Sequence, residues 1–531
     1  MITSSDDSGT MLAEDAPRSS RSKVRTLDEV AVLAAEARRQ GRTVALAHGV
    51  FDLLHLGHVR HLEEARRHGD LLIVTITADP FVNKGPGRPV FSELLRAQMV
   101  AALEHVDYVA VNPAPTAVTV LSKVKPSVYV KGSDYADASS DVTGGIVDER
   151  NAVERCGGRI VFTDDITFSS SSLINRYLGV YDAELQAYLE DARDRNMLER
   201  TLEVLESVRD KRVLLVGDTI IDEYRYVVPM AKSPKENMIA TLYRDHETFA
   251  GGVIAAANHV AAFCAQVDVV TCLGEHSRYE DLIRQTLKPN VSLRVVDRPG
   301  KPTTRKTRFV ETGYMRKLFE VYEMDDAPLD ADEEQRLVHI LERHAGDYDV
   351  VIATDFGHGM LTPAAVDALC RHSRFLAVNT QTNSGNMGYN LITRYPRADF
   401  VCIDAPEARL AISDRFSDIA IIASQKLPQR IACGRIIITH GKHGCVTFDG
   451  AESDGAEGVH RIPAFTNTVV DTVGAGDAFL AVTAPLVAAG APMSVIGFIG
   501  NAAGAIKVGI VGHRRSIEKP ALIKFLTAIL K

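Results

Sequence analysis

The chain has 531 residues, a formal net charge of −9, and 46% apolar and 24% charged residues. This length exceeds one ordinary core, so we expect two or three domains of a soluble globular protein. The negative charge and the absence of a basic block argue against nucleic acid as a partner, because binding the phosphate backbone requires a concentrated positive face.

Seven cysteines are scattered along the chain without a C-x-x-C pair. Such an unpatterned set is typical of free thiols in a reducing compartment, so we expect a cytoplasmic protein. Residues 1–25 are polar and contain no apolar segment of a signal peptide, and we interpret them as a disordered tail. The apolar stretch 478–511 is interrupted by glycine and proline, so we interpret it as two buried helices and expect no membrane association.

The first part of the chain alternates short apolar runs with helical segments. Helices are expected at 59–67 and 93–103. Runs rich in β-branched residues suit strands that are buried on both faces. The expected strands are 44–47, 71–77, 108–111, 128–130 and 160–162. Alternating strands and helices predict an α/β domain with a parallel sheet covered on both sides.

The segment 48–58, HGVFDLLHLGH, follows the first expected strand and precedes a helix. A helix start offers free N–H groups and a partial positive charge to a phosphate. Imidazoles placed there can donate hydrogen bonds to a phosphoryl group whose charge rises in the transition state. The two-histidine spacing alone would more often be structural or a metal pair.

The whole string resembles the H-x-G-H nucleotidyltransferase superfamily, and in particular its cytidylyltransferase-like branch. Supporting segments follow in the family's order at 84–89, 130–135 and 168–174, with Arg96 on the helix after the first of them. The resemblance covers about residues 40–178 and implies a Rossmann-like domain, which we place at 26–178. It implies in-line attack by a sugar phosphate on the α-phosphorus of a nucleoside triphosphate, with pyrophosphate leaving.

The resemblance also assigns roles to individual residues. It makes His55, His58 and Lys84 catalytic, with both imidazoles stabilising the triphosphate. No general base is required, because the attacking phosphate is already ionised. The nucleotide would be held by Gly49, Phe51, Arg88, Lys131, Ser170, Ser171 and Arg176. Either Arg88 or Arg176 could instead be a solvated surface charge.

Between the two parts, apolar residues at spacings of three and four predict one or two amphipathic helices within 185–208. We interpret 179–210 as a helical linker that covers an edge of one domain, with a dimerisation helix as the alternative. A second α/β region opens at Arg212. Its expected strands are 213–216, 267–271, 350–353, 375–378, 400–403 and 436–439.

The segment 471–479, DTVGAGDAF, leads into the apolar helical stretch. Small residues before a helix leave backbone N–H groups that point at a phosphate. Asp477 beside them can accept the proton of an attacking sugar hydroxyl. The string resembles the signature of the ribokinase (PfkB) carbohydrate kinases, which implies a ribokinase-like α/β domain with a small β lid over 211–531.

This second resemblance makes Asp477 the catalytic base. It implies nucleotide contacts at Thr439, Gly441, Gly444, Gly474, Ala475, Gly476 and Asn501. It implies sugar contacts at Asp218, Asp222, Gly251, Gly252, Arg308, Asp355, Asn379 and Gln381. Asp404 and Glu407 take the place of the family's Asn-x-x-Glu, which organises Mg²⁺, and a carboxylate pair still suits a hard cation. A monovalent cation is a further expectation at the kinase site.

The combination resembles the bifunctional family of heptose-7-phosphate kinase and heptose-1-phosphate adenylyltransferase, with the domain order reversed. It implies ATP or CTP and a sugar phosphate as substrates, an ADP-heptose-like nucleotide sugar as product, and a homodimer. The sugar side departs from that family. Ala255 replaces an asparagine, and the segments 355–359 (DFGHG) and 379–381 (NTQ) each lack a lysine of the family.

Lysine is a strong partner for a substrate phosphate, so we expect the two reaction classes rather than the heptose itself. Asn379, Gln381, Asn383 and Asn386 form either a loop that binds the sugar or an ordinary polar loop. Two alternatives stay open: the same reactions on another sugar or polyol phosphate with CTP, or a sensor of nucleotide or sugar phosphate with one degenerate domain.

Overall fold

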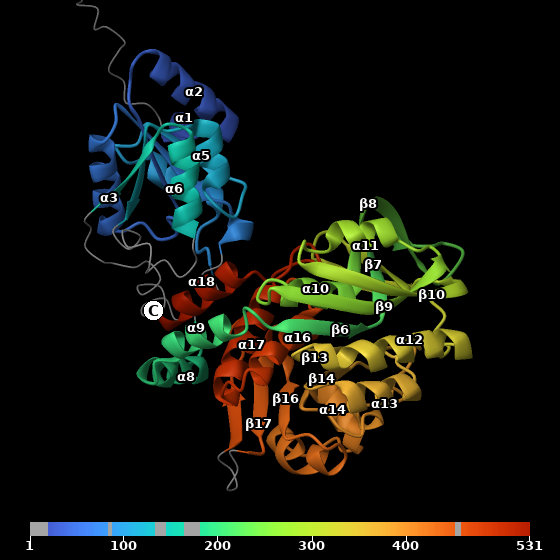
Figure 1. Cartoon of the computed structure of the whole chain (residues 1–531). Helices are drawn as coiled ribbons and strands as arrows, with labels where there is room; N and C mark the ends of the chain where they lie inside the picture. Colours follow the sequence, from blue (N-terminus) through green and yellow to red (C-terminus); the bar gives the residue numbers. More distant parts are fainter. Residues whose placement is uncertain (1–19, 83–87, 133–144, 164–180, 452–457) are drawn as a thin grey trace, which may run out of the picture. The chain divides into compact units, whose positions relative to one another are not determined.

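The computed structural model describes residues 20–82, 88–132, 145–163, 181–451 and 458–531. The chain divides into two compact units, Met1–Gly179 and Val180–Lys531 (Figure 1). Among the described residues, no helix has the length and apolar character needed to span a bilayer.

The first unit contains a five-stranded parallel sheet with the strand order β3-β2-β1-β4-β5. All five strands expected from the sequence are present. The strands are β1 (Val44–Gly49), β2 (Leu71–Thr77), β3 (Tyr108–Asn112), β4 (Val128–Gly132) and β5 (Arg159–Thr163). The described helices are α1 (Ser20–Lys23), α2 (Leu27–Arg39), α3 (Leu56–Arg67), α4 (Glu93–Ala101), α5 (Val118–Val124) and α6 (Gly145–Arg155).

Alternation along the central strand explains the two layers of helices. Val44 and Leu46 of β1 join a core with α2, α5 and α6, whereas Ala45 and Ala47 join a core with α3 and α4. Successive side chains of a strand point to opposite faces, so an unbroken apolar run requires a cover on both. The parallel sheet with helices on both sides is therefore confirmed.

The expected disordered tail over 1–25 ends earlier than predicted. Lys23 Nζ donates to the Leu103 carbonyl at 3.1 Å, and the Arg25 backbone N–H donates to the Val109 carbonyl at 2.9 Å. Residues 20–25 are therefore fixed against the sheet by backbone groups that the polar composition of this segment does not reveal.

The second unit contains a nine-stranded sheet with the order β10-β9-β6-β13-β14-β15-β16-β17-β18. It is parallel as far as β16, and β17 and β18 continue it antiparallel. The strands are β6 (Arg212–Gly217), β9 (Gln266–His276), β10 (Val291–Pro302), β13 (Val350–Asp355), β14 (Leu376–Thr380), β15 (Phe400–Asp404), β16 (Arg435–Thr439), β17 (Cys445–Asp449) and β18 (Val459–Ile462). The six expected strands are all among them.

Two cores lie on opposite faces of this sheet. Val213 and Leu215 of β6 join the core of α10, α16 and α17, and Leu214 and Val216 join the core of α12, α13 and α14 (Figure 1). The helices are α10 (Val253–Val260), α11 (Glu280–Thr286), α12 (Ala331–His344), α13 (Pro363–His372), α14 (Ala405–Ile412), α15 (Ile419–Ile421), α16 (Ala475–Ala488), α17 (Met493–Lys507) and α18 (Lys519–Leu530). Because α16 and α17 are almost wholly buried, they confirm the interpretation of the apolar stretch 478–511.

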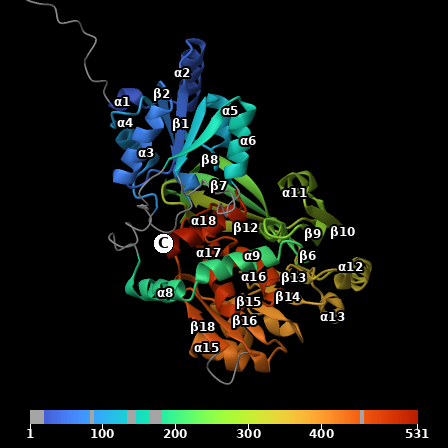
Figure 2. The same ribbon diagram turned by 60° about the vertical axis from the view of Figure 1, so that its left-hand side comes forward.

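The segment expected as a linker forms α8 (Ala183–Asp194) and α9 (Met197–Ser207), which belong to the second unit (Figure 2). Leu189 and Leu205 are part of its core. Arg193 Nε donates to the Leu530 carbonyl at 3.0 Å. These helices pack against α17 and α18, so burial of their apolar face occurs within one unit.

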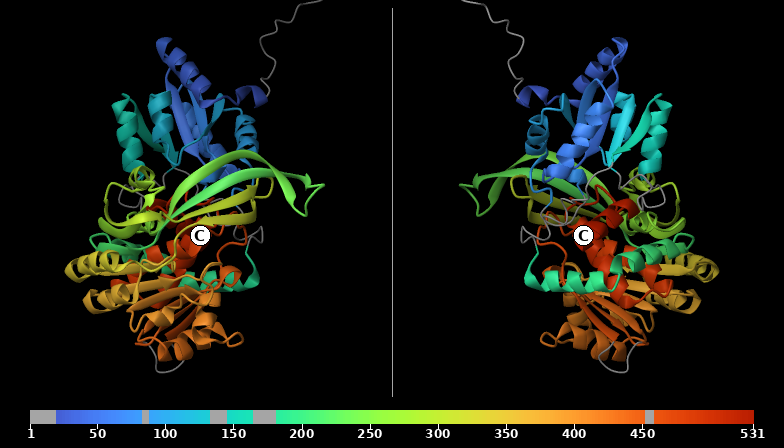
Figure 3. Two further views of the ribbon diagram at one scale, coloured as in Figure 1. Left: turned by 90° about the vertical axis from the view of Figure 1, so that its right-hand side faces the viewer. Right: turned by 90° about the vertical axis from the view of Figure 1, so that its left-hand side faces the viewer.

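A separate four-stranded sheet, which we call the lid, has the order β12-β11-β7-β8. Its strands are β7 (Thr219–Lys232), β8 (Ile239–Gly252), β11 (Arg305–Glu311) and β12 (Arg316–Glu323). Figure 3 shows the long strands β7 and β8, in green, extending past the rest of the second unit. The bases of these strands carry Asp222, Gly251 and Arg308, three of the residues predicted to contact the sugar.

Candidate active sites

The H-x-G-H segment starts α3 as predicted. His55 is the N-cap residue, and its Nδ1 accepts the Gly57 backbone N–H at 3.1 Å. The His55 and His58 rings stack with centroids 4.0 Å apart. Phe51, which has a positive φ of 49°, places its ring centroid 5.2 Å from that of His58. Both imidazoles therefore lie at a helix start, where an anionic group is favoured.

Two buried polar residues that the sequence analysis did not assign to the site hold the surrounding loops. Asp52 Oδ1 accepts the Val90 backbone N–H at 2.6 Å. Arg96 is fully buried and donates to the carbonyls of Val50 at 2.5 Å and Thr77 at 2.8 Å. The ends of β1 and β2 are thus tied to α4. The available signals were the place of Asp52 within the string 48–58 and that of Arg96 on the helix after residues 84–89.

The other predicted residues of this site differ in their surroundings. A Cβ on Gly49 would lie 3.0 Å from the Phe51 ring, so this position favours glycine. Arg88 is half-buried. Lys131 Nζ forms a buried ion pair with Glu149 at 2.9 Å, which gives it an internal partner. The predicted residues Lys84, Ser170, Ser171 and Arg176 lie outside the described residues.

In the second unit, the Gly-rich segment forms the start of α16. Gly474 is its N-cap with φ +74°, and Ala475, Gly476 and Asp477 make its first turn. A Cβ on Gly474 would lie 2.6 Å from His513 Cε1, so a larger residue would collide. A Cβ on Gly476 would meet no atom within 4 Å, so there is open space beside the first turn. A phosphoryl group has both room and N–H donors here.

Asp477 is buried and carries a perturbed carboxyl group. Burial raises its pKa to about 6, although His513 and Lys507 act in the opposite direction. Gln381 Nε2 donates to Asp477 Oδ1 at 2.7 Å. A carboxylate whose pKa lies close to neutrality and whose orientation is fixed by an amide is suited to proton transfer.

Lys507 is a fully buried residue that the sequence analysis did not single out. Its ammonium donates to the carbonyls of Val473 at 2.6 Å and Gly512 at 2.8 Å. Burial lowers its pKa to about 8. It therefore fixes the Gly-rich segment to the chain after α17 and leaves positive charge beside the helix start. The sequence signal was one lysine at the end of an apolar helix.

Asp222 forms an ion pair with Arg308 and lies 3.2 Å from His513 Nε2. Burial opposes ionisation of Asp222, but Arg308 and His513 together hold its pKa well below the usual range. A Cβ on Gly251 would lie 2.2 Å from Asp222 Oδ2, so this glycine allows the close approach. Asp222, Gly251 and Arg308 are thus brought together as predicted, and His513 is the partner that the sequence did not reveal.

Asp218 lies at the end of β6 and accepts the backbone N–H groups of Phe356 at 3.2 Å and His358 at 3.4 Å. Burial and the nearby Asp355 carboxyl raise its pKa to about 7. A Cβ on Gly252, whose φ is +58°, would lie 2.4 Å from the Asp218 carbonyl oxygen. Asp218 and Gly252 are therefore neighbours, as the predicted sugar site requires.

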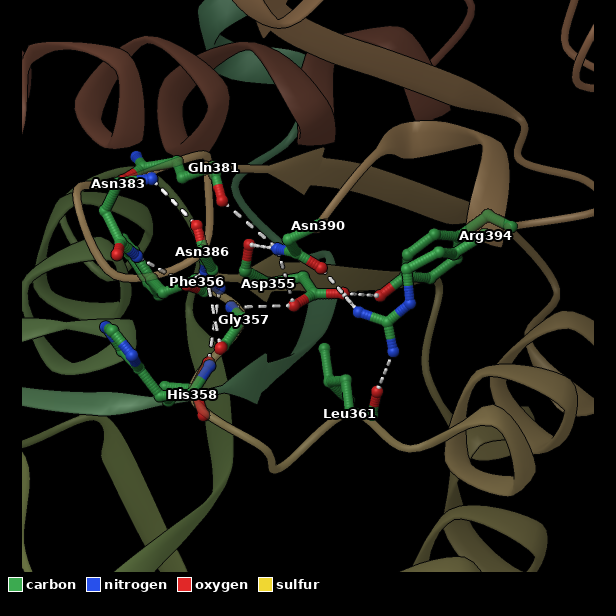
Figure 4. Close-up of polar contacts among 12 residues, drawn as sticks. Asp355, Phe356, Gly357, His358, Leu361, Gln381, Asn383, Asn386, Asn390 and Arg394 are labelled. Atoms are coloured by element: carbon green, nitrogen blue, oxygen red, sulfur yellow. Dashed lines mark hydrogen bonds and ion pairs between the residues drawn. The ribbon is translucent and has the colours of Figure 1, made fainter. Parts of the chain in front are cut away.

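Asp355 is buried and bonded to protein groups (Figure 4). Its carboxylate accepts the Gly357 N–H at 3.0 Å, Asn390 Nδ2 at 3.1 Å, Arg394 Nη1 at 3.3 Å and the Tyr395 hydroxyl at 3.1 Å. These contacts give Asp355 an internal role in ordering the loop after β13. Its predicted contact with a sugar would have to compete with these partners.

The four amide residues expected in a loop, Asn379, Gln381, Asn383 and Asn386, differ in what they contact. Asn383 Nδ2 and Asn386 Nδ2 both donate to the Phe356 carbonyl, at 3.0 and 2.9 Å (Figure 4). Asn379 Nδ2 donates to the Cys402 carbonyl at 2.8 Å, and its Oδ1 is buried without a partner among the described residues. Asn383 and Asn386 thus behave as an ordinary polar loop, whereas Gln381 contacts Asp477.

The predicted nucleotide-side residues come from three elements. Thr439 ends β16, and Gly441 and Gly444 follow with φ values of +54° and +78°. A Cβ on Gly444 would lie 1.9 Å from the Ile462 carbonyl oxygen, so this turn requires glycine. Asn501 on α17 donates from Nδ2 to the same carbonyl at 3.1 Å. Asn501 and Gly444 are therefore joined through the end of β18.

Asp404 and Glu407 form a reciprocal cap at the start of α14. Asp404 Oδ1 accepts the Glu407 N–H at 2.8 Å, and Glu407 Oε2 accepts the Asp404 N–H at 3.1 Å. Burial, then the Asp404 carboxyl, raise the pKa of Glu407 to about 8. A divalent cation would satisfy two such close carboxyl groups, and the cap leaves oxygen lone pairs for it.

No cluster of three or more His, Cys, Asp or Glu side chains suited to a metal exists among the described residues. A Mg²⁺ ion at Asp404 and Glu407 would therefore need water and substrate phosphates as further ligands. This is the usual arrangement for Mg²⁺, which keeps several waters and is bound by one or two carboxylates.

Comparisons with known proteins match both units. A family model described as "Cytidylyltransferase-like" matches residues 46–176. The "Bifunctional protein HldE" of Syntrophotalea carbinolica is 38% identical over 164 residues, which are 30% of this chain and 32% of that protein. The protein of the same name from Geobacter sulfurreducens is 37% identical over 167 residues, with the same shares. These matches cover the cytidylyltransferase part, so the chain spans 32% of each relative.

Phosphofructokinase-2 from Escherichia coli, in complex with potassium, aligns with 60% of this chain and 99% of its own at 15% identity and a TM-score of 0.49. A likeness at that level carries no argument about activity. The family model described as "pfkB family carbohydrate kinase" matches residues 210–520, which is more than half of the chain. The chain therefore belongs to the pfkB family of carbohydrate kinases and carries a cytidylyltransferase-like segment ahead of its kinase part.

Proposed function

We propose that the chain is a bifunctional sugar-activating enzyme. Its kinase part transfers the γ-phosphoryl group of ATP to a sugar or sugar phosphate. Its N-terminal part transfers a nucleotidyl group from ATP or CTP to a sugar 1-phosphate, which gives a nucleotide sugar and pyrophosphate. The observation that carries the proposal is the buried Asp477 in the first turn of a helix whose start has room for a phosphoryl group.

In the kinase step, the acceptor hydroxyl attacks the γ-phosphorus, its proton passes to Asp477, and ADP leaves. The N–H groups at the start of α16 stabilise the charge on the transferred group. Gln381 keeps the Asp477 carboxylate aimed at the acceptor. Mg²⁺, when bound by Asp404 and Glu407, would neutralise charge on the ATP phosphates.

In the nucleotidyl transfer, a sugar 1-phosphate oxygen attacks the α-phosphorus and pyrophosphate leaves. His55 and His58 donate hydrogen bonds to the phosphate oxygens, and the start of α3 adds its N–H groups. Arg88 and the predicted Lys84, Ser170, Ser171 and Arg176 would complete the triphosphate site. The attacking phosphate is already ionised, so this step uses donors and requires no proton acceptor.

The proposal includes the assembly and location of the enzyme. It has a nucleotidyltransferase domain over 26–178 and a kinase domain over 211–531, joined by the segment with α8 and α9. We propose a homodimer that uses the lid, because the lid exposes the apolar side chains of Met230, Ile239, Leu242, Tyr243, Phe319 and Val321.

The seven unpaired cysteines support a reducing, cytoplasmic location. A monovalent cation at the kinase site remains part of the proposal.

Mass spectrometry of the products tests the two activities separately. The full chain is incubated with Mg²⁺, ATP or CTP, and either a free sugar, a sugar phosphate such as heptose 7-phosphate, or a sugar 1-phosphate. We expect phosphorylated sugar from the kinase part and a nucleotide sugar from the N-terminal part. Nucleotide binding without any product would instead favour a sensor.

A further inference from the structure

His358 is a buried imidazole without hydrogen-bond partners among the described residues. It follows β13 in the turn that begins at Phe356, and it is 3% exposed. Neither Nδ1 nor Nε2 has a partner within the described part of the chain. Figure 4 shows its ring pointing away from the network around Asp355 and Arg394. Because buried polar atoms are nearly always paired, two open nitrogens on one buried ring mark a position that suits a polar ligand.

The position of His358 places this ligand in the sugar site. The His358 backbone N–H donates to Asp218 Oδ2 at 3.4 Å. Lys306, on the lid strand β11, is the charged group that acts on the ring. His358 therefore lies next to Asp218 at the end of β6, and its ring is influenced by the lid strand that also carries Arg308.

The imidazole is neutral in this environment. Burial lowers the pKa of His358 to about 3, and the positive charge of Lys306 acts in the same direction. A neutral imidazole has one N–H donor and one acceptor nitrogen. A sugar hydroxyl also donates and accepts, so it matches the ring. A phosphate at neutral pH mainly accepts, so it would leave the acceptor nitrogen facing oxygen lone pairs.

The guanidinium of Arg308, on the same lid strand as Lys306, is already paired by the protein. Arg308 is paired with Asp222 and with Glu320, whose Oε2 lies 3.2 Å from Arg308 Nε. The ammonium of Lys306 lies 5.0 Å from the centre of the Tyr322 ring, and the carboxylates of Asp222 and Asp218 act on it. A phosphate dianion placed here would have to compete with Asp222 and Glu320 for Arg308.

Resting on the proposed kinase activity, we propose that His358 binds a neutral hydroxyl of the acceptor, and that the kinase part therefore acts on an uncharged sugar or polyol in preference to its phosphorylated form. Sites built to hydrogen-bond a hydroxyl discriminate strongly, because an ill-matched group leaves buried polar atoms unpaired. His358 is thus a specificity-determining residue of the acceptor site.

A neutral acceptor has a consequence for the order of reactions. The kinase product then carries a single phosphate. Where that phosphate is on the anomeric oxygen, the product has the form that the nucleotidyl transfer requires. No phosphatase step is then needed between the two parts of the chain.

The test compares kinetics of the full chain with matched acceptor pairs: mannose and mannose 6-phosphate, fructose and fructose 6-phosphate, and heptose and heptose 7-phosphate. We expect kcat/KM for ADP release to favour a neutral sugar by about tenfold or more over its phosphate. H358Q keeps a donor and an acceptor and should retain this preference. H358L should raise KM by about tenfold or more with a smaller change in kcat. H358K should shift the preference toward the phosphorylated acceptor.

His372 at the exposed end of α13 supplies the matched control, because H372K adds the same charge away from the site and should change neither KM nor the preference. Thermal unfolding of each variant identifies losses due to misfolding, and if H358L misfolds, the wild-type preference and the shift expected for H358K decide the result. A wild-type preference for sugar phosphates, or an H358L variant with unchanged KM, overturns the proposal.

Calorimetric titration of the same sugars into D477N separates this inference from the proposed function. If no sugar is turned over by the wild type but neutral sugars bind D477N, and not D477N/H358L, the kinase activity fails and the acceptor site stands. If sugars are phosphorylated but only the phosphorylated members of the pairs bind or react, the kinase activity stands and the role of His358 fails.

Discussion

The two helix starts of this chain present the same backbone feature with opposite side-chain chemistry. At α3, His55 and His58 supply stacked imidazoles that can donate to a phosphate. At α16, Asp477 supplies a buried carboxylate. The difference follows from the attacking group. A sugar phosphate is already ionised and needs only charge stabilisation, whereas a sugar hydroxyl must lose a proton.

The neighbourhoods of the two sites reflect this difference. Asp477 lies near charged groups of both signs, with His513 and Lys507 lowering its pKa and Asp222 raising it. Burial outweighs them and raises its pKa toward neutrality. At α3, Asp52 and Arg96 are used to fix loops around the imidazoles. The site at α16 raises the pKa of a proton acceptor, whereas the site at α3 positions hydrogen-bond donors.

Replacing Asp477 by Asn should have the largest effect. The variant keeps the shape of the side chain and removes the proton acceptor, so kcat of the kinase should fall by about 10²–10⁴-fold. The rate of nucleotide-sugar formation from sugar 1-phosphate should stay within error and serves as the internal control. Equal loss of both activities would contradict the division of roles between α16 and α3.

Replacing His58 by Ala should reduce the other activity. Loss of one donor to the transition-state phosphate should lower nucleotidyl transfer by about 10²–10³-fold, by analogy with an oxyanion-hole donor. Kinase turnover should not change. His55 needs a different variant, because it caps α3. H55N retains a capping side chain, so it should lose activity while keeping the melting temperature of the wild type.

The pH dependence should distinguish the two sites further. The pKa of Asp477 is about 6 in the fold, above the usual carboxyl value, so kinase kcat should fall about tenfold per pH unit below that value. The same raised pKa favours the protonated form, so its stabilising contribution is present at low pH and is lost as pH rises through about 6. D477N should therefore be at least as stable as the wild type at pH 8 in thermal unfolding. The rate of nucleotidyl transfer should not show this decrease at low pH, because Asp477 takes no part in that reaction.

Replacing Gln381 by Ala should have the smallest effect. The change removes one hydrogen bond to Asp477 Oδ1, so kinase kcat should fall by up to about tenfold, with little change in KM for ATP. Asn383 provides the comparison, because its amide holds the Phe356 carbonyl instead. N383A should affect thermal stability more than kcat. If Q381A and the wild type had the same kinetic constants, Gln381 would have no role in the kinase site.

The sequence was sufficient for most of the parallel strands because they are short apolar runs, such as the fully buried Leu71–Thr77. It did not locate the parallel strand β10, whose residues alternate between partly buried and exposed. It did not locate the lid strands, since the buried Asp222 and Glu223 interrupt the apolar run of β7 and exposed charged residues interrupt that of β8. It also placed the end of the tail too late, because the contacts of Lys23 and Arg25 are made to distant backbone carbonyls.

The motif residues could be predicted because segments such as 48–58 and 471–479 each bring the functional residues of one site together at a single helix start. Residues whose partners are distant in sequence were missed. His513 meets Asp222, and Tyr224 donates to Asp471 across 247 positions. Nothing in the local sequence around these residues indicates such pairs, whereas burial of both members in the fold makes them evident.

The most direct measurement follows both products in one reaction, by mass spectrometry, with the wild type, D477N and H58A. Each is given Mg²⁺, ATP, and either a free sugar or its 1-phosphate. The account predicts that D477N still converts the sugar 1-phosphate to a nucleotide sugar but cannot phosphorylate the free sugar, and that H58A does the reverse. Loss of both activities in either variant, or of neither, would contradict two independent phosphate-binding helix starts with separate chemistry.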